Sequence, residues 1–472
     1  MAIFNSDCYT SLCRKGIACR CPTPSDGHPD SAGTCRARLP TIQATVLSGP
    51  AATRRWPAAA TAAQPQVLIM KYQWPPYFWV CFSMCVGVMG TALASPLYPL
   101  YQAQWQLPPS AITQVFVLYM AAALTSLMLL GAITTRYGFF KVLRAGVVLM
   151  SAGVLLSALA WNMQVFGLSR IIIGLASGMI TTSASLGLTQ LNTSGDTQRA
   201  AATTSLTIAF GFGLGPIVGG LVAQWAPFPL RSAYLPSLLL SALAIYSLFQ
   251  VQLPAHLQPA PASSSFGLRQ LMPRLTFPER TALRRYGLAS MGAFCAFGMF
   301  SLFASLAPSF MQSMLPWHGP AISGPSIGLI LLLSAASQYA AKGFVTRKVL
   351  ITGYAALALC NLLLIANVFA SSAAVFLLCV LSAALGHGLC NLGGISVVNR
   401  VARADNRAGL LATYLVIGYV GTILPILGIG WLSDQVGLSR ALLVFCAVFA
   451  LLATALALAT WRTPVPVPAA KH

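Results

Sequence analysis

Acidic side chains are scarce in this sequence, which has seven Asp and Glu but 28 Lys and Arg among 472 residues. Charged residues of both signs make up only 7%, whereas globular proteins carry about 25%. This composition excludes an ordinary soluble domain. None of the acidic residues falls inside a long apolar run, so no buried carboxylate is expected there. The seven are Asp7, Asp26, Asp30, Asp196, Glu279, Asp405 and Asp434.

Signatures of enzymes and of bound metals are also missing. The chain has no H-E-x-x-H motif and no P-loop, and its one G-x-S-x-G match, Gly324–Gly328, begins an apolar run without an acid nearby. Five of the twelve cysteines lie in the first 69 residues, but no C-x-x-C pair occurs. We therefore expect neither an enzyme, nor a cofactor, nor a metal site.

Long apolar runs are what the sequence has in abundance, since 57% of its residues are hydrophobic. A run of about 20 residues suffices for a helix to cross a bilayer. The pattern predicts an all-α membrane protein with twelve transmembrane helices. The predicted spans are 77–99, 110–132, 143–160, 166–190, 204–224, 232–250, 287–312, 324–341, 349–368, 374–398, 409–430 and 441–461. The eighth is the weakest, because Ser334, Ser337 and Gln338 dilute it.

Basic residues follow the alternation of these spans. Only Arg231 and Arg440 fall in one set of loops. The other loops hold Arg136, Lys141, Arg144, Arg199, Arg269, Arg274, Arg280, Arg284, Arg285, Lys342, Arg347, Lys348, Arg400, Arg403 and Arg407. Cytoplasmic loops are enriched in Lys and Arg, so we expect both termini in the cytoplasm of a multi-pass protein of a bacterial inner membrane. The net charge of +21 then meets anionic lipid, and nucleic-acid binding is not expected.

The chain divides into segments of different composition. Residues 1–69 lack an apolar run and are expected to be a disordered tail. They are either a targeting segment or an extension upstream of a natural start at Met70, the reading we favour. Residues 251–286 are rich in Pro, Ser and Arg and would form a cytoplasmic linker. The expected segments are 1–69, 70–250, 251–286, 287–462 and 463–472.

The two sets of six spans resemble each other at a fixed offset. The pairs Pro99 and Pro308, Pro216 and Pro425, Gly219 and Gly428, and Arg231 and Arg440 are each 209 residues apart. They fall in equivalent spans, the first with the seventh and the fifth with the eleventh. Inverted or parallel repeats of this size are typical of secondary transporters, which bind their solutes between the repeats.

Three motifs carry a more specific resemblance. The loop after the second span reads G-A-I-T-T-R-Y-G-F-F-K and contains Gly131, Thr135, Arg136, Gly138 and Lys141. The fourth span has Arg170 followed by Gly174 and Gly178. The fifth span contains Gly211, Gly215, Pro216, Gly219 and Gly220.

These motifs are similar to those of the major facilitator superfamily, and the third resembles the motif of its drug and metabolite exporters. The resemblance covers residues 70–462 and implies two pseudo-symmetric six-helix bundles that work by alternating access. Two departures stand out. Thr135 occupies a position where the loop motif usually has Asp, which weakens a charge-based gate. No carboxylate lies in an early span, so coupling to protons through one is disfavoured.

Arg170 is the candidate for binding solute in the N-terminal half. A charge in mid-membrane costs about 2.5 to 3.5 kcal/mol on insertion scales, so it is seldom kept without a task. Ser177 and Thr181 continue its helix face with polar groups. An arginine there favours carboxylates or other anionic groups. The alternative is a structural arginine that bonds the carbonyl groups of neighbouring helices.

His387, Asn391 and Gln338 are the candidates in the C-terminal half. His387 and Asn391 are four residues apart and share a helix face, and histidine titrates near neutral pH. The alternative is a neutral histidine bonded to a neighbouring helix. Gln338 would line the eighth span. The glycines of the fifth span, with Pro216 and Pro425, are expected to serve helix packing and bending.

We therefore expect a secondary transporter that moves a small organic solute and acts as an exporter. An uncoupled facilitator or importer of an organic anion is the first alternative, and a non-transporting membrane receptor or scaffold is the second. The expected partners are the solute and the lipid bilayer, while a proton as coupling ion stays open. We expect a monomer.

Overall fold

A computed structural model describes residues 75–463, except 130, 193–195, 254–274, 317–318 and 404. The expected tail 1–69, most of the expected linker and residues 464–472 lie outside the described residues. The halves of the described chain belong to one compact unit. Every regular element in this part of the chain is helical.

The N-terminal half runs from α2 to α10. Its elements are α2 (Pro76–Ala92), η1 (Ser95–Leu97), α3 (Tyr98–Trp105), α4 (Pro109–Leu129), α5 (Gly131–Tyr137), α6 (Phe139–Ala158), α7 (Met163–Gln190), α8 (Thr197–Trp225), α9 (Pro229–Ser232) and α10 (Leu235–Gln250). The C-terminal half follows. Its elements are α11 (Arg280–Ser305), α12 (Ala307–Met314), α13 (Pro320–Ala340), α14 (Thr346–Ala370), α15 (Ala373–Val401), α16 (Arg407–Val436) and α17 (Leu438–Trp461).

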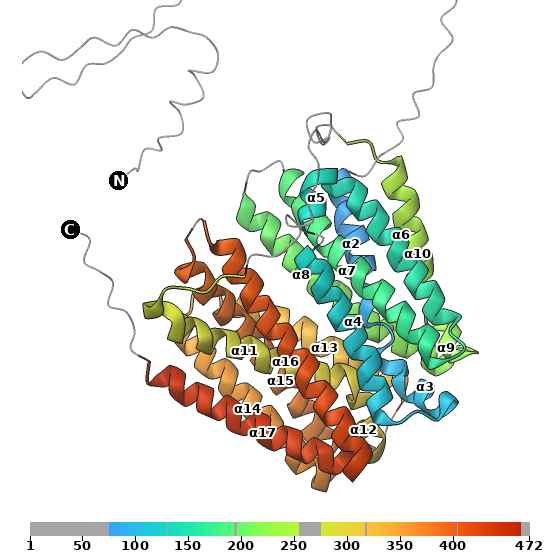
Figure 1. The fold of residues 1–472 in the computed structure, drawn as a ribbon. Coiled ribbons are helices and arrows are strands. Elements are labelled where there is room, and N and C mark those ends of the chain that lie inside the picture. The colour runs from blue at the N-terminus through green and yellow to red at the C-terminus, as the bar shows by residue number, and fades with distance from the viewer. Residues whose placement is uncertain are drawn as a thin grey trace, which may run out of the picture. The chain divides into compact units, whose positions relative to one another are not determined.

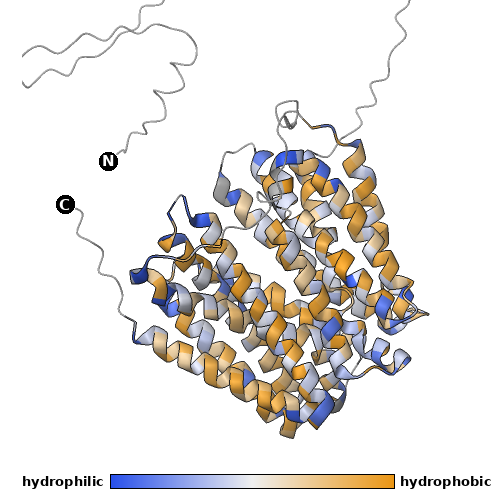
Figure 2. Ribbon diagram, in the orientation of Figure 1, coloured by the Kyte–Doolittle hydropathy of each residue, from blue (hydrophilic) through white to orange (hydrophobic). Residues whose placement is uncertain are grey.

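The described residues contain twelve helical segments that are long and apolar enough to cross a membrane, and these coincide with the twelve predicted spans. The eighth, α13, has the lowest hydropathy of the twelve, as its sequence indicates. Hydrophilic residues gather at the ends of the helices and hydrophobic ones between them (Figure 2). The predicted fold class is therefore confirmed.

Several helices begin before their apolar runs. The third span was expected from residue 143, but α6 starts at Phe139, so Lys141 and Arg144 lie in its first turns rather than in a loop. Likewise α11 starts at Arg280, seven residues before the apolar run. Hydropathy marks only the part of a helix that contacts lipid. Long basic side chains extend the helix into the interface, where their charged ends reach water.

The first and seventh spans are not continuous helices, contrary to the expectation. α2 ends at Ala92 and the chain resumes as η1 and α3, while α11 ends at Ser305 and resumes as α12. Pro99 and Pro308 each occupy the first turn of the new helix, where the missing N–H costs nothing. The proline pair at offset 209 thus breaks the same span in both halves.

Helices pack in the same pairs in the two halves. In the N-terminal half α2 packs on α7 and α8, α6 on α7 and α10, and α4 on α7. In the C-terminal half α11 packs on α15 and α16, α14 on α15 and α17, and α13 on α15. These pairs correspond one to one when the spans are numbered within each half. The halves are therefore structural repeats, as the offset predicts.

We call the end of the molecule that carries Arg136, Lys141, Arg347 and Arg400 the basic end. At this end an arginine bonds the C-terminal carbonyl groups of the last helix in each half. Arg144 donates to the Leu248 carbonyl over 3.0 and 2.7 Å from Nε and Nη2, and Arg347 donates to the Trp461 carbonyl. A guanidinium satisfies carbonyl groups that a helix end leaves free.

The main contacts between the halves involve α8 with α13, α4 with α16, and the short helices α3 and α12. The end opposite the basic end holds α3, α9 and α12, in the lower part of Figure 1. There Ser309 Oγ donates to Gln102 Oε1 over 2.7 Å, and the Ser110 amide donates to Asp434 Oδ1 over 3.2 Å. At the basic end, α5 packs on α4, α6 and α7, which all belong to the N-terminal half. The halves are thus joined at the opposite end.

Candidate functional site

Arg170 lies in the eighth position of α7 and is only 1% exposed. Its Nη2 donates to Ser157 Oγ over 2.9 Å, and its Nη1 donates to the Thr91 carbonyl over 3.3 Å. The guanidinium carbon also lies 5.2 Å from the centre of the Phe166 ring, within range of a cation–π contact. Arg170 therefore holds together α2, α6 and α7.

Tyrosines close this region toward the opposite end. The hydroxyls of Tyr101 and Tyr234 are 3.0 Å apart, and the Tyr101 ring packs at a tilt against Phe166, with ring centres 4.3 Å apart. We call Arg170, Thr91, Ser157, Phe166, Tyr101 and Tyr234 the arginine cluster. The four described carboxylates, Asp196, Glu279, Asp405 and Asp434, are all exposed, so none neutralises Arg170. Its positive charge is solvated by neutral oxygen atoms and an aromatic ring, without a counter-charge among the described residues.

The guanidinium of Arg170 has spare donor capacity. Its Nε is buried without a hydrogen-bond partner among the described residues. A buried unpaired donor costs about 1 to 3 kcal/mol, more when charged, so it marks a place where water or a ligand group fits. Because α7 begins at Met163 and not at residue 166, Arg170 lies seven residues from the start of its helix, deeper than the predicted span suggested.

His387 lies at the middle of α15 and is half-buried. Its Nδ1 is 2.8 Å from Ser334 Oγ on α13, and the Asn391 amide nitrogen is 3.3 Å from its Nε2. Gln338 Nε2 also donates to Ser334 Oγ, over 3.4 Å. The structure thus brings together three residues singled out in the sequence, because His387 contacts Asn391 directly and is linked to Gln338 through Ser334.

Aromatic rings from α11 cover this histidine. The Phe297 ring stacks on His387 with centres 6.0 Å apart, and the Phe300 ring lies 5.8 Å away. We call His387, Ser334, Gln338, Asn391, Phe297 and Phe300 the histidine cluster. Gly388 allows it to form, because a Cβ there would come within 2.5 Å of the Ser334 carbonyl oxygen. Only glycine lets α13 and α15 approach this closely.

A pair of tyrosines lies between the two clusters. Tyr119 on α4 and Tyr419 on α16 lie close to each other where these two helices pack across the boundary between the halves. Tyr119 in turn interacts with the hydroxyls of Thr91 and Ser177 and with Arg170. The Tyr419 ring packs edge-on against Phe297, with centres 6.0 Å apart. Polar and aromatic groups therefore connect Arg170 with His387 at mid-depth.

The other polar residues on the face of Arg170 have different surroundings. Ser177 is 6% exposed and faces Tyr119. Thr181 donates to the Ser177 carbonyl of its own helix over 2.8 Å, which satisfies its only hydrogen. Gly174 and Gly178 lie against α4, where a Cβ would meet Tyr119 O at 2.5 Å and Ser126 Oγ at 2.4 Å. Much of this face therefore packs against α4.

The loop motif of residues 131–141 forms α5 and the start of α6. Gly138 has a φ of 83°, a left-handed conformation that favours glycine. Arg136 is half-buried with its guanidinium carbon 5.9 Å from the Tyr137 ring, and Lys141 is exposed. The side-chain positions at Gly131 and Thr135 lie outside the described part of the chain. The motif shapes the basic end of the N-terminal half.

The glycines of α8 face two different helices. A Cβ at Gly211, Gly215 or Gly219 would come within 2.6 Å of a carbonyl oxygen of the first span, from Cys85, Met89 and Leu93 respectively. On another face, a Cβ at Gly220 would meet the Pro320 carbonyl at 2.2 Å, and Gly324 approaches the Pro216 carbonyl as closely. This motif lets α8 pack tightly within its own half and against α13 of the other.

Several residues of the two clusters and between them were not predicted from the sequence. Thr91, Ser157, Tyr119 and Tyr419 are spread over four helices and share no spacing that would single them out. Phe297 lies in an apolar run with many other aromatics. Only Ser334 carried a signal, because it precedes Gln338 by one helical turn.

The architecture defines a class of protein. Two six-helix repeats cross the membrane, polar groups from both repeats meet at mid-depth, and the repeats are joined at one end. This is the construction of a secondary transporter that exposes its solute site alternately to the two sides.

The sequence assigns the chain to one superfamily of such transporters. Residues 80–347 match the model of the Major Facilitator Superfamily, which is more than half of the chain. The chain therefore belongs to the Major Facilitator Superfamily and is a multi-pass integral membrane transporter. No curated protein matches the sequence.

Solved structures share the fold at low identity. A POT family transporter in complex with 5-aminolevulinic acid has a TM-score of 0.66 and 13% identity over 80% of this chain and 94% of that chain. A bacterial homologue of the human lysosomal transporter Spinster, in an inward-facing and unoccupied conformation, has a TM-score of 0.60 and 13% identity over 82% and 96%. The human organic anion transporter MFSD10 (TETRAN) has a TM-score of 0.54 and 18% identity over 81% and 100%.

Proposed function

We propose that this transporter exports a small polar or anionic organic solute by alternating access. The observation that carries the proposal is the packing of α4 on α16, which brings Tyr119, beside the arginine cluster, close to Tyr419, beside the histidine cluster. A solute bound at this depth would touch both halves. Its contacts would therefore depend on which end of the boundary between the halves is closed.

Within the proposed site the two clusters have different roles. His387, Asn391 and Gln338 are half-buried and offer donors and acceptors for direct contact with the solute. Arg170, with Ser177 and Thr181 on its face, supplies positive charge behind Tyr119 and one unpaired donor, Nε. An uncompensated positive charge in a region of low dielectric attracts carboxylates and repels cations.

We further propose that the basic end faces the cytoplasm. The enrichment of Lys and Arg in the loops at this end supports that orientation, and a bacterial inner membrane is the location we favour. The contacts between the halves then make the structure closed outside. The close packing of α8 on α13 at Gly220 and Gly324 would close the path of the solute on the outer side.

Export rests on the fifth-span motif, which resembles that of exporters. An uncoupled facilitator or importer is the second candidate. One observation favours this candidate. The four described carboxylates are all exposed, so none of them is buried in a span where it could carry a proton. His387 is the group we propose as proton carrier if coupling occurs.

Solute flux into proteoliposomes tests the proposal. Purified protein is first screened for thermal stabilisation by carboxylates, amino acids, nucleosides and cationic drugs. The best solute is then followed in vesicles with and without a pH gradient, for the native protein, Arg170→Ala and His387→Ala. Arg440→Gln, an exposed arginine at the opposite end, is the control.

We expect carboxylates to stabilise the protein, and flux to fall at least tenfold in both cluster variants but not in Arg440→Gln. Acceleration by a pH gradient would favour coupled export, and flux indifferent to it would favour the facilitator. Unchanged flux in Arg170→Ala would remove Arg170 from the mechanism. Stabilisation by cations alone would refute the anion preference.

A further inference from the structure

A cavity apart from the candidate site lies at the basic end, within the C-terminal half. Its volume is about 590 Å³, and the ends of α11, α14, α15 and α17 line it together with the segment before α11. We call it the basic pocket. It shares no residue with the arginine or histidine cluster, so solute transport does not account for it.

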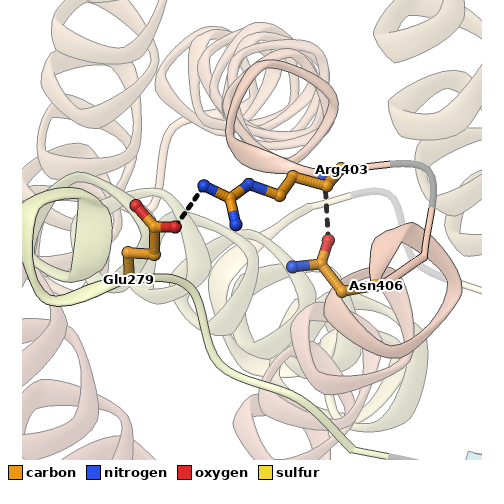
Figure 3. Close-up of polar contacts among 3 residues, drawn as sticks. All are labelled: Glu279, Arg403 and Asn406. Carbon is orange, nitrogen blue, oxygen red and sulfur yellow. Dashed lines mark hydrogen bonds and ion pairs between the residues drawn. The ribbon is translucent and has the colours of Figure 1, made fainter.

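Four arginines and one glutamate line this pocket: Arg285, Arg347, Arg400, Arg403 and Glu279. At the rim Arg403 Nη2 forms an ion pair of 2.5 Å with Glu279, and the Arg403 amide donates to Asn406 Oδ1 over 2.8 Å (Figure 3). Glu279 can balance only one of the four positive charges. The pocket therefore retains a strong positive potential.

Two of these arginines have donors to spare. Arg347 donates from Nη2 to the Trp461 carbonyl, while its Nε is buried without a partner among the described residues. Arg400, in the last turn of α15, makes no hydrogen bond or ion pair within the described chain. Guanidinium groups bind phosphate through two parallel N–H bonds, so spare donors on two arginines suit a phosphate group.

Most of the remaining lining is apolar and includes Leu288, Val397 and Val401, and its polar members are Thr346, Asn406, Thr460 and Thr463. A site that combines arginines with apolar walls fits an amphiphile rather than a bare ion. Among the described residues, the other carboxylate close to the lining in sequence is Asp405, which is exposed and does not line the pocket. An external anion with an apolar part is the complement of this pocket.

We propose that the basic pocket binds an anionic phospholipid, with the phosphate on Arg347 and Arg400 and the glycerol and acyl carbons on the apolar wall. The pocket opens at the helix ends, where the phosphates of the membrane surface lie. Phosphate is the shared chemistry of lipid headgroups and soluble phosphate esters. The membrane supplies the lipid at that depth continuously.

Native mass spectrometry of the delipidated, full-length protein tests this assignment. Phosphatidylglycerol is titrated in, and phosphatidylcholine with the same acyl chains is the neutral comparison. The double variant Arg347→Gln/Arg400→Gln removes the two guanidinium groups that have spare donors. The matched double variant Arg280→Gln/Arg284→Gln removes the same charge from the same end at positions outside the pocket.

We expect phosphatidylglycerol to bind at least tenfold more tightly than phosphatidylcholine. The pocket variant should lose about tenfold in affinity, and the matched control should stay within about twofold. Because Arg347→Gln also removes a helix cap, Val401→Trp fills the pocket with every arginine in place and should weaken binding similarly.

Equal weakening in both double variants would mean general surface attraction and would overturn the proposal. Full binding by Val401→Trp would overturn it as well, since the cavity would then be irrelevant. Displacement of the lipid by an equimolar amount of glycerol 3-phosphate would overturn the assignment to a lipid and identify a soluble phosphate ester instead.

Discussion

The two halves share one arrangement of helices but have different interiors. In the N-terminal half a full charge is buried at 1% exposure and held by Thr91, Ser157 and the Phe166 ring. In the C-terminal half His387 is half-buried among side chains of α13 and α15. One repeat therefore holds a fixed charge, while the other offers polar groups that can exchange partners.

This division has a physical cause. A buried guanidinium cannot lose its proton at ordinary pH, so it must be bonded in every conformation. A histidine, an amide and a serine are neutral and tolerate changes of partner at lower cost. The rigid part of the proposed site is therefore in the first half, and the adaptable part is in the second.

Replacing Arg170 and His387 should give the largest difference in stability between variants of the two halves. Arg170→Met removes two charge-assisted hydrogen bonds and leaves Ser157 Oγ with one partner fewer, so we expect a loss of about 2 to 4 kcal/mol of stability, partly offset by the relief of desolvation. His387→Gln keeps a polar group beside Ser334 and should change stability by less than about 1 kcal/mol. Thermal unfolding of both purified variants measures the difference.

The same pair of variants should differ in another way during transport. Arg170→Met is expected to lose flux together with stability, whereas His387→Gln is expected to lose flux alone. If Arg170→Met unfolded at the same temperature as the native protein, the charge of Arg170 would not hold the helices together. Direct contact with the solute would then become its main role.

Equivalent glycines provide a second contrast between the halves. Gly219 and Gly428 are 209 residues apart, yet a Cβ at Gly219 would come within 2.6 Å of the Leu93 carbonyl oxygen, while one at Gly428 would meet nothing within 4 Å. We expect Gly219→Ala to cost about 1 to 3 kcal/mol through overpacking, and Gly428→Ala to be neutral or slightly stabilising. Unfolding temperatures in one detergent report both.

Equal effects at the two positions would contradict this contrast. They would mean that α16 packs through its Gly428 face in the membrane. In the structure α16 instead approaches α11 through Gly421, where a Cβ would meet the Phe294 carbonyl at 2.3 Å.

These contrasts also mark how far the sequence could lead. Hydropathy predicted all twelve spans, because lipid contact imposes a run of apolar residues on any crossing helix. The offset of 209 predicted the repeat and paired Pro99 with Pro308, but the breaks in those spans depend on how the short helices pack at the opposite end. The offset also pairs Gly219 with Gly428, but it did not predict that their surroundings differ. A glycine can face either lipid or a neighbouring helix, so its presence does not tell the two apart.

The candidate site was predictable only within single helices. Four-residue spacing placed His387 beside Asn391, since such residues share a helix face. The approach of Gln338 to them depends on Ser334 and on Gly388, which belong to different spans. For the same reason the partners of Arg170, from α2 and α6, carried no signal in the sequence.

Removing the hydroxyls of Tyr119 and Tyr419 should have the smallest effect and is the most direct test of a connection between the halves. The single variants Tyr119→Phe and Tyr419→Phe each remove one member of the pair and leave its ring in place. Because the two tyrosines lie close together on helices that pack across the boundary, we expect the effects on solute affinity to be non-additive by about 0.5 to 1 kcal/mol in a double-mutant cycle.

Tyr286→Phe is a suitable control for this cycle. Its hydroxyl donates to the Leu410 carbonyl over 2.7 Å within the C-terminal half and touches neither cluster. Combined with Tyr119→Phe it should give additive effects. If Tyr119 and Tyr419 were also additive, the fixed charge of one half and the adaptable groups of the other would bind solute independently, and the tyrosines would only fill space between them.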